Sequence, residues 1–299
     1  MRIAYRAEYA LPLPPKHRFP MAKYELLPEQ LLYEGTAEPE NFFAPEPIDL
    51  ESLFLTHSRE YYRRLRAEEL TRKEVRAIGF PLSQKLVDRE LIIAQGTLDG
   101  ARYSRRDGVA FNIAGGTHHS FRESGEGFCV FNDIAVAANV LLATGEAARV
   151  LVVDLDVHQG NGTAAIFSDE PRVFTLSVHG ERNYPLRKQR SDLDIGLPDG
   201  TEDEEYLACV GATVPELLDR LRPHQVFYLA GVDVLGDDKL GRLSLSREGC
   251  RERDRIVLQA CADREVPVAV SMGGGYAPRL ATIIEAHANT YRTARSIFG

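Results

Sequence analysis

Residues 150–163 read VLVVDLDVHQGNGT. An apolar run rich in valine opens this stretch, and acidic, histidine and glycine residues follow it directly. A near-continuous β-branched run is typical of a strand buried on both faces, as in a parallel sheet. The polar residues therefore stand at the carboxyl end of a predicted strand, where ligands bind in open parallel sheets.

Similar short apolar runs lie on both sides of this stretch, and amphipathic segments separate them. The further predicted strands cover residues 109–113, 173–176, 226–229 and 266–270. The predicted helices between and after them cover residues 134–142, 201–221, 247–264 and 279–297. Residues 201–204 (TEDE) match a capping box, which predicts the start of one helix. This alternation predicts an α/β fold with an open, mostly parallel sheet flanked by helices.

The N-terminal part of the chain has a different pattern. Prolines punctuate residues 12–47, where we expect a surface arm with one short helix near 28–32. Helical patterns follow at residues 59–69 and 82–103. We expect one domain over residues 1–299, with residues 1–58 forming an arm and loop region packed on it.

The composition narrows the classes of function. The chain has 299 residues, 44% of them apolar, so it can bury a sizeable core. Its formal net charge of −8 argues against a nucleic-acid partner, which normally meets a basic surface. The same charge is compatible with a cationic partner, such as a lysine-bearing peptide or a polyamine.

The four cysteines and the N-terminus indicate the compartment. No two cysteines form a C-x-x-C pair, which argues against a structural zinc finger, and four are too few for a disulfide framework. The N-terminus lacks a signal-peptide profile, and no apolar run approaches the roughly 20 residues of a membrane span. We therefore expect a cytoplasmic protein without a membrane span. No pattern in the sequence specifies its oligomeric state.

Each predicted strand leads into a polar or glycine-rich cluster. In chain order, these clusters are residues 115–119, 154–158, 177–179, 231–233 and 273–276. Because parallel strands end at one edge of their sheet, we expect residues far apart in sequence to meet there.

The second of these clusters, together with Asp233, has the chemistry of a metal site. Asp154, Asp156 and His158 recur with period two, so an extended chain would point them to one side. Two carboxylates that converge on a buried edge stay ionised only if a cation lies between them. An Asp-x-His pair with Asp233 as third ligand leaves a position open for water, as in catalytic zinc sites. Iron(II) fits the same ligands, since one histidine and two carboxylates select weakly.

Two further features favour catalysis. His118 and His119 are adjacent and point differently, so an acid–base role fits better than joint binding of one ion. Tyr276 follows three glycines and can donate to a developing oxyanion. Taken singly, each of these residues could also be a cap or a packed side chain. Residues 160–162 lack the G-x-G-x-x-G spacing, which argues against a dinucleotide-binding oxidoreductase.

Together these segments resemble the histone deacetylase family, whose fold is the arginase-like α/β sheet. The matches occur in the family's order: GGTHH (115–119), GFCVFND (127–133), DLDVHQGNGT (154–163), GVD (231–233) and GGGY (273–276). Residues 17–20 (HRFP) extend the likeness to the N-terminal arm. Residues 200–206, with the glycines after His158, look most like the class IV branch.

The resemblance implies roles for the candidate residues. The zinc ligands would be Asp156, His158 and Asp233. His118 and His119 would be the catalytic pair, with His119 as the general base and Asp154 orienting His118. Tyr276 would stabilise the tetrahedral intermediate.

The resemblance also implies substrate contacts and a second ion. The substrate would meet Gly127, Phe128 and Gly274, with Phe128 forming one wall of a tunnel. A structural potassium ion would use Asp154, Asp156, His158, Ser177 and Val178, partly through backbone oxygens. Two positions depart from the family: Asn161 replaces the aspartate of many relatives beside His119, and Thr117 replaces an aromatic residue. Tyr184 is our candidate for the opposite tunnel wall.

The implied function is zinc-dependent hydrolysis of acetyl-lysine or longer acyl-lysine in proteins or peptides. Deacetylation of acetylpolyamines or other small acyl-amines is the alternative with the same chemistry. An acyl-lysine-binding protein without catalysis is the alternative from another class.

Overall fold

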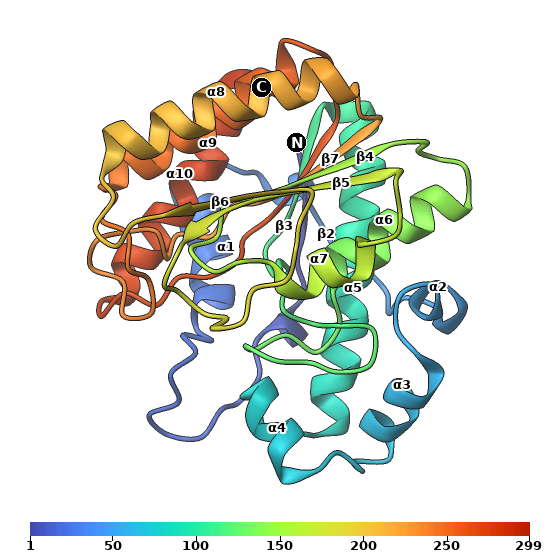
Figure 1. The fold of residues 1–299 in the computed structure, drawn as a ribbon. Coiled ribbons are helices and arrows are strands. Elements are labelled where there is room, and N and C mark those ends of the chain that lie inside the picture. Colours follow the sequence, from blue (N-terminus) through green and yellow to red (C-terminus); the bar gives the residue numbers. More distant parts are fainter.

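The computed structural model describes residues 1–299, which form one eight-stranded sheet flanked by helices (Figure 1). The strands follow the order β2-β1-β3-β8-β7-β4-β5-β6, and every pairing is parallel. They are β1 (Arg2–Ala4), β2 (Phe42–Phe43), β3 (Val109–Asn112), β4 (Val150–Asp154), β5 (Val173–Gly180), β6 (Leu193–Leu197), β7 (Gln225–Leu229) and β8 (Val268–Ser271). The predicted open parallel α/β sheet is confirmed.

The valine-rich run at residues 150–153 forms most of β4, one of the inner strands. All five residues of β4 are buried, and the strand pairs with β5 on one side and β7 on the other. The polar residues after β4 and β7 therefore emerge side by side at the same edge of the sheet. This adjacency positions the candidate site.

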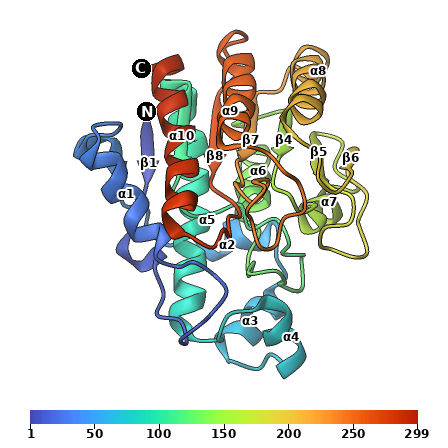
Figure 2. The same cartoon turned by 90° about the vertical axis from the view of Figure 1, so that its left-hand side faces the viewer.

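Helices cover both faces of the sheet. They are α1 (Lys23–Tyr33), α2 (Leu50–Phe54), α3 (Arg59–Arg66), α4 (Arg72–Ile78), α5 (Gln84–Asp107), α6 (Asp133–Ala143), α7 (Asn161–Phe167), α8 (Asp203–Leu221), α9 (Arg247–Ala262) and α10 (Leu280–Phe298). Helices α8, α9 and α10 pack in a row on one face with α1 beside α10, whereas α5, α6 and α7 lie on the other (Figure 2). None of these helices combines the length and the apolar character that crossing a bilayer requires.

Several elements differ from the expectation. The helix expected near 28–32 is the longer α1, and β1, β2 and β6 were not expected because they are short or half-exposed. Strand β5 continues through Gly180, so residues 177–179 lie within it instead of following it. The predicted capping box is wrong: the Thr201 hydroxyl donates to the carbonyl of Pro198, and the cap residue Glu202 makes no capping hydrogen bond.

Candidate metal centre and catalytic pocket

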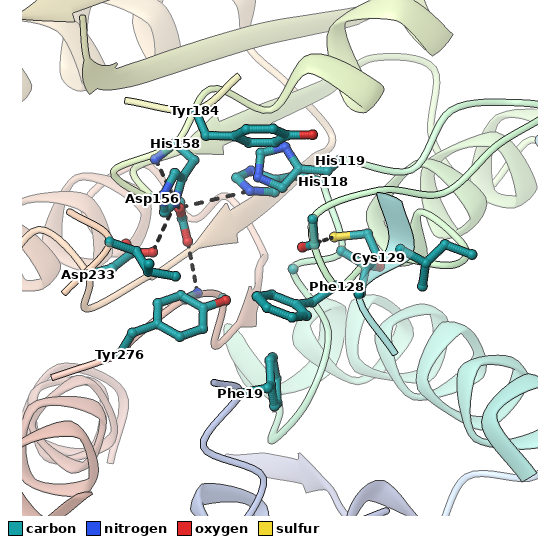
Figure 3. Close-up of a pocket in the computed structure, with 18 of the residues that line it drawn as sticks. Phe19, His118, His119, Phe128, Cys129, Asp156, His158, Tyr184, Asp233 and Tyr276 are labelled. Atoms are coloured by element: carbon teal, nitrogen blue, oxygen red, sulfur yellow. Dashed lines mark hydrogen bonds and ion pairs between the residues drawn. The ribbon is translucent and has the colours of Figure 1, made fainter. Parts of the chain in front are cut away.

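Three buried side chains from two neighbouring strand ends meet at one point. Asp156 and His158 follow β4, and Asp233 follows β7. Their candidate ligand atoms all lie within 4.8 Å of one another. His158 Nδ1 lies 2.9 Å from Asp156 Oδ1 and 3.2 Å from Asp233 Oδ2 (Figure 3). The structure thus brings the three predicted zinc ligands together.

The chain after β4 is not extended, so the period-two argument for this segment is wrong. The backbone N–H of Asp156 donates to Asp154 Oδ1 at 3.1 Å, and that of His158 donates to Asp156 Oδ1 at 3.0 Å. These two side-chain-to-backbone bonds form successive tight turns. As a result Asp154 faces His118, while Asp156 and His158 face Asp233.

The protonation tendencies of this cluster fit a bound divalent cation. Burial, reinforced by Asp156, raises the pKa of Asp233 to about 7. Although burial opposes it, contact with the two carboxylates raises the pKa of His158 to about 10. Asp233 Oδ2 is buried, and apart from its 3.2 Å contact with His158 Nδ1 it has no hydrogen-bond partner, so it is available as a ligand. One nitrogen and two carboxylate oxygens are ligands that zinc accepts, and a cation there would replace the proton on His158.

Gly274 is required by the close approach of the loop after β8 to this cluster. Its backbone N–H donates to Asp156 Oδ2 at 2.8 Å. A Cβ at this position would lie 1.9 Å from Asp233 Oδ2, a distance that the carboxylate could not accommodate. The glycine thus allows backbone to pass against both acidic ligands.

The histidine pair lies beside the acidic cluster, and each ring is held through its Nδ1. His118 Nδ1 lies 2.6 Å from Asp154 Oδ2, and its Nε2 lies 3.9 Å from Asp156 Oδ1. His119 Nδ1 lies 2.6 Å from Asn161 Oδ1. Asp154 and Asp156 outweigh burial and raise the pKa of His118, whereas burial and the neighbouring histidines lower the pKa of His119 well below its usual value. The two rings therefore have opposite protonation tendencies.

Asn161 determines which nitrogen of His119 is free. Its amide nitrogen donates to Glu126 Oε1 at 2.6 Å, so its oxygen faces His119. An acceptor at Nδ1 keeps the proton on that nitrogen and leaves the Nε2 lone pair available. Glu126 was missed by the sequence analysis, because only the fold places it behind Asn161.

Tyr276 stands opposite the histidines. Burial, with Asp233 and Asp156 nearby, raises the pKa of its phenol well above the usual value, so the hydroxyl remains a donor at neutral pH. Its backbone N–H donates to Asp238 Oδ2, and the ammonium of buried Lys23 donates to the carbonyl of Gly273 in the same loop. Both contacts hold the loop that presents the phenol.

The cavity in front of these groups has a volume of about 540 Å³ and aromatic walls. Phe128 packs against Phe19 and Tyr276, with ring centroids 5.3 and 6.0 Å apart. Tyr184 lies opposite, 4.9 Å from the His119 ring (Figure 3). Gly127, Phe128 and Gly274 line the cavity, as expected of substrate-contacting residues, and so does Thr117. Phe19 belongs to the HRFP segment but was not predicted as a site residue.

The residues expected to hold potassium lie beside the same edge. Asp154 pairs in register with Ser177 across β4 and β5. Ser177 and Val178 are buried, and the Ser177 hydroxyl lies 2.9 Å from His179 Nδ1. Asp154, Ser177 and Val178 therefore lie on two neighbouring strands, and Asp156 and His158 follow the first of them.

The chain was compared with known proteins. A family model described as the histone deacetylase domain matches residues 17–291. Over 278 residues the chain is 30% identical to histone deacetylase 2 of Arabidopsis thaliana, covering 90% of this chain and 72% of that protein. It is 43% identical over 296 residues to an uncharacterized protein of Picosynechococcus sp., covering 99% of both chains.

Solved structures show the same fold. A crystal structure of an HDAC homolog complexed with SAHA matches with a TM-score of 0.85 and 24% identity, covering 99% of this chain and 84% of that one. The HDA15 HD domain matches with a TM-score of 0.81 and 21% identity, covering 97% of this chain and 89% of that one. At these identities the likeness concerns the fold alone.

Proposed function

Because the chain belongs to the histone deacetylase family, we propose that it is a zinc-dependent amidohydrolase that removes acetyl or longer acyl groups from lysine side chains. The main support is the convergence of Asp156, His158 and Asp233 beside a histidine pair and a half-buried phenol. When bound, zinc supplies Lewis-acid polarisation of the amide carbonyl and acidifies water at the site. Iron(II) would serve the same ligands.

The surrounding side chains divide the remaining work. His119, held by Asn161 through Nδ1, accepts the proton of the attacking water at Nε2. His118 is paired with Asp154, which favours its protonated form. The protonated His118 is a source of the proton for the leaving amine. Tyr276 donates to the oxyanion of the tetrahedral species.

The cavity walls orient the substrate. Phe19 and Phe128 on one side and Tyr184 on the other would enclose the aliphatic stem of the acyl-lysine. A potassium ion at Asp154, Asp156, His158, Ser177 and Val178 would stabilise the ends of β4 and β5 with oxygen ligands. We also propose that residues 1–299 act as one catalytic domain.

A substrate panel with metal analysis tests this proposal. The purified protein is assayed on an acetyl-lysine peptide, a long-chain acyl-lysine peptide and an acetylpolyamine, before and after chelation and zinc repletion. We expect hydrolysis of acyl-lysine peptide that is lost on chelation and returns with zinc. Tight binding of the peptide by metal-loaded protein without any hydrolysis would contradict the proposal and indicate a non-catalytic reader. A cleaved acetylpolyamine with intact peptides would indicate a small-molecule deacetylase.

A further inference from the structure

The rim of the cavity is cationic, although the chain as a whole has a formal net charge of −8. Arg18 and Arg76 line the cavity, are exposed, and form no ion pair. The third lining arginine, Arg89, is buried and ion-paired. Apart from Asp156 and Asp233 at the metal centre, no carboxylate lines the cavity. The charge at the entrance thus has the opposite sign to that of the molecule.

Local contacts place both arginines beside the aromatic wall. The Arg18 guanidinium lies 5.7 Å from the centroid of the Phe128 ring. Arg76 bonds only to the backbone carbonyl of Arg72, so its charge is not neutralised. The carbonyl of the next residue, Ala77, accepts from the N–H of Gly127 at 2.9 Å. The end of α4 is therefore fixed against the segment that carries the wall.

The segment that carries Tyr184, on the opposite side of the cavity, has an excess of basic residues over its one acidic residue, Glu181, although its arginines lie outside the cavity lining. Tyr184 belongs to residues 181–190, a segment that carries three further exposed arginines without ion-pair partners. These are Arg182, Arg187 and Arg190. In the same segment, the Lys188 ammonium donates to the backbone carbonyls of Asn183 and Pro185. The nearby Glu126 carboxylate accepts from the Asn161 amide and lies outside the cavity lining.

We propose that this cationic rim, centred on Arg18 and Arg76, selects acyl-amine substrates that carry a carboxylate close to the scissile amide. This inference rests on the proposed function and specifies its substrate class. A cluster of unpaired positive charges raises the local concentration of an anionic ligand and repels a cationic one. Acyl-lysine flanked by aspartate or glutamate fits the rim, whereas acetylpolyamines and acyl-lysine in basic peptides do not.

Three peptides of equal length test the preference, with one acetyl-lysine flanked by Asp and Glu, by Asn and Gln, or by Lys and Arg. At low salt we expect kcat/KM to fall in that order, with a spread of about tenfold or more. In about 1 M NaCl, where the Debye length is roughly 3 Å, the spread should shrink severalfold. A second arm compares kcat/KM for free Nε-acetyl-lysine with that for its α-amide, which lacks the carboxylate. A higher value for the free amino acid would show that the rim recognises the carboxylate of the acylated residue itself, and equal values would show that it recognises neighbouring acidic side chains.

Charge reversal at the rim identifies the residues responsible. In the double variant Arg18→Glu/Arg76→Glu we expect the order of the peptides to invert. The control Arg105→Glu changes another exposed arginine, on α5 outside the cavity lining, and should retain the wild-type order. Milder Arg18→Gln and Arg76→Gln variants should each reduce the preference if the double variant folds poorly.

Equal rates for the three peptides at low salt, or a preference that survives both rim substitutions, would overturn the inference. Failure of the proposed function is distinguishable, because no peptide would then be hydrolysed at any salt concentration. In that case fluorescence anisotropy of the same labelled peptides with metal-loaded protein still measures the charge preference. Tighter binding of the acidic peptide would support the rim's role, and equal binding would contradict it.

Discussion

We expect the Tyr276 hydroxyl to stabilise the oxyanion of the amide-hydrolysis transition state without helping to bind the metal. Its hydroxyl makes no predicted contact with the metal, and burial keeps it protonated. We predict that Tyr276→Phe lowers kcat roughly 100-fold or more, since loss of one oxyanion donor has effects of that size. Zinc content, measured by mass spectrometry, should stay at the wild-type level. Tyr33→Phe, which alters an exposed tyrosine on α1 outside the cavity, is the control. Unaltered turnover in Tyr276→Phe would remove the phenol from the mechanism.

Burial lowers the pKa of His119, and Asn161 opposes this only through the hydrogen bond of a neutral amide. A carboxylate at the same 2.6 Å distance would favour the imidazolium and raise the pKa of His119. Because a general base must be neutral to act, the acidic limb of the kcat/KM profile should move to higher pH in Asn161→Asp, by roughly one unit. The pH profile of Asn289→Asp, on α10, should match wild type. A shift to lower pH, or none, would show that His119 is not the base.

For single residues, the sequence predicted which side chains lie at the site better than it predicted where they point. Asp156, His158 and Asp233 were found because strand ends of a parallel sheet share an edge. The tight turns after β4, which direct Asp154 to His118, depend on backbone bonds that an alternating pattern does not show. Glu126 and Arg76 could not be assigned to the site, because their roles depend on how distant loops pack.

Helix α9 contacts the segments that carry the candidate metal ligands through a fully buried arginine, Arg253. Arg253 donates to the carbonyls of Leu155 and Gly231, which precede two of the candidate ligands, and pairs with Asp254. Asp254 also accepts from the Tyr228 hydroxyl. The helix thus connects the ends of β4 and β7.

We predict that Arg253→Met destabilises the fold by about 3–5 kcal/mol, because it leaves Asp254 as a buried charge without its cation. Urea unfolding measures the change. The matched control on the same helix is Arg251→Met, which removes only an exposed pair with Glu248 and should cost no more than about 1 kcal/mol. Equal losses in the two variants would contradict the supporting role of Arg253.

Among the elements, long or fully apolar segments were predictable and short edge segments were not. Strands β4 and β7 are buried throughout and read clearly as apolar runs. Strands β1 and β2 have only three and two residues, too few for a periodic signal, and their pairing depends on neighbours distant in sequence. The expected capping box failed because Thr201 bonds to the preceding turn instead.

At the scale of the whole molecule, the N-terminal arm is part of the sheet. Strand β1 pairs with β3 in register from Arg2 opposite Ala110, and α1 packs on α10. We therefore predict that the arm and the remainder unfold together, so that far-UV circular dichroism and tyrosine fluorescence give coincident thermal transitions. A separate early transition, with release of the arm to limited proteolysis, would show that residues 1–58 form an independent unit.

The overall charge and the charge at the cavity entrance favour different partners. The net charge of −8 is compatible with a cationic ligand such as a polyamine, whereas the rim that we propose, with Arg18 and Arg76, favours an anionic one. Net charge sums over the whole surface, whereas a ligand responds to the few charges within roughly a Debye length of its binding site. Only the fold shows which arginines those are.

The account depends on one divalent ion held by Asp156, His158 and Asp233. An anomalous difference map from crystals of the zinc-loaded protein, collected at the zinc absorption edge, tests this most directly. We predict one strong peak at about 2.0–2.2 Å from a nitrogen of His158 and from one oxygen of each aspartate. A map with no peak among these three side chains, or with the ion bound by other residues, would contradict it.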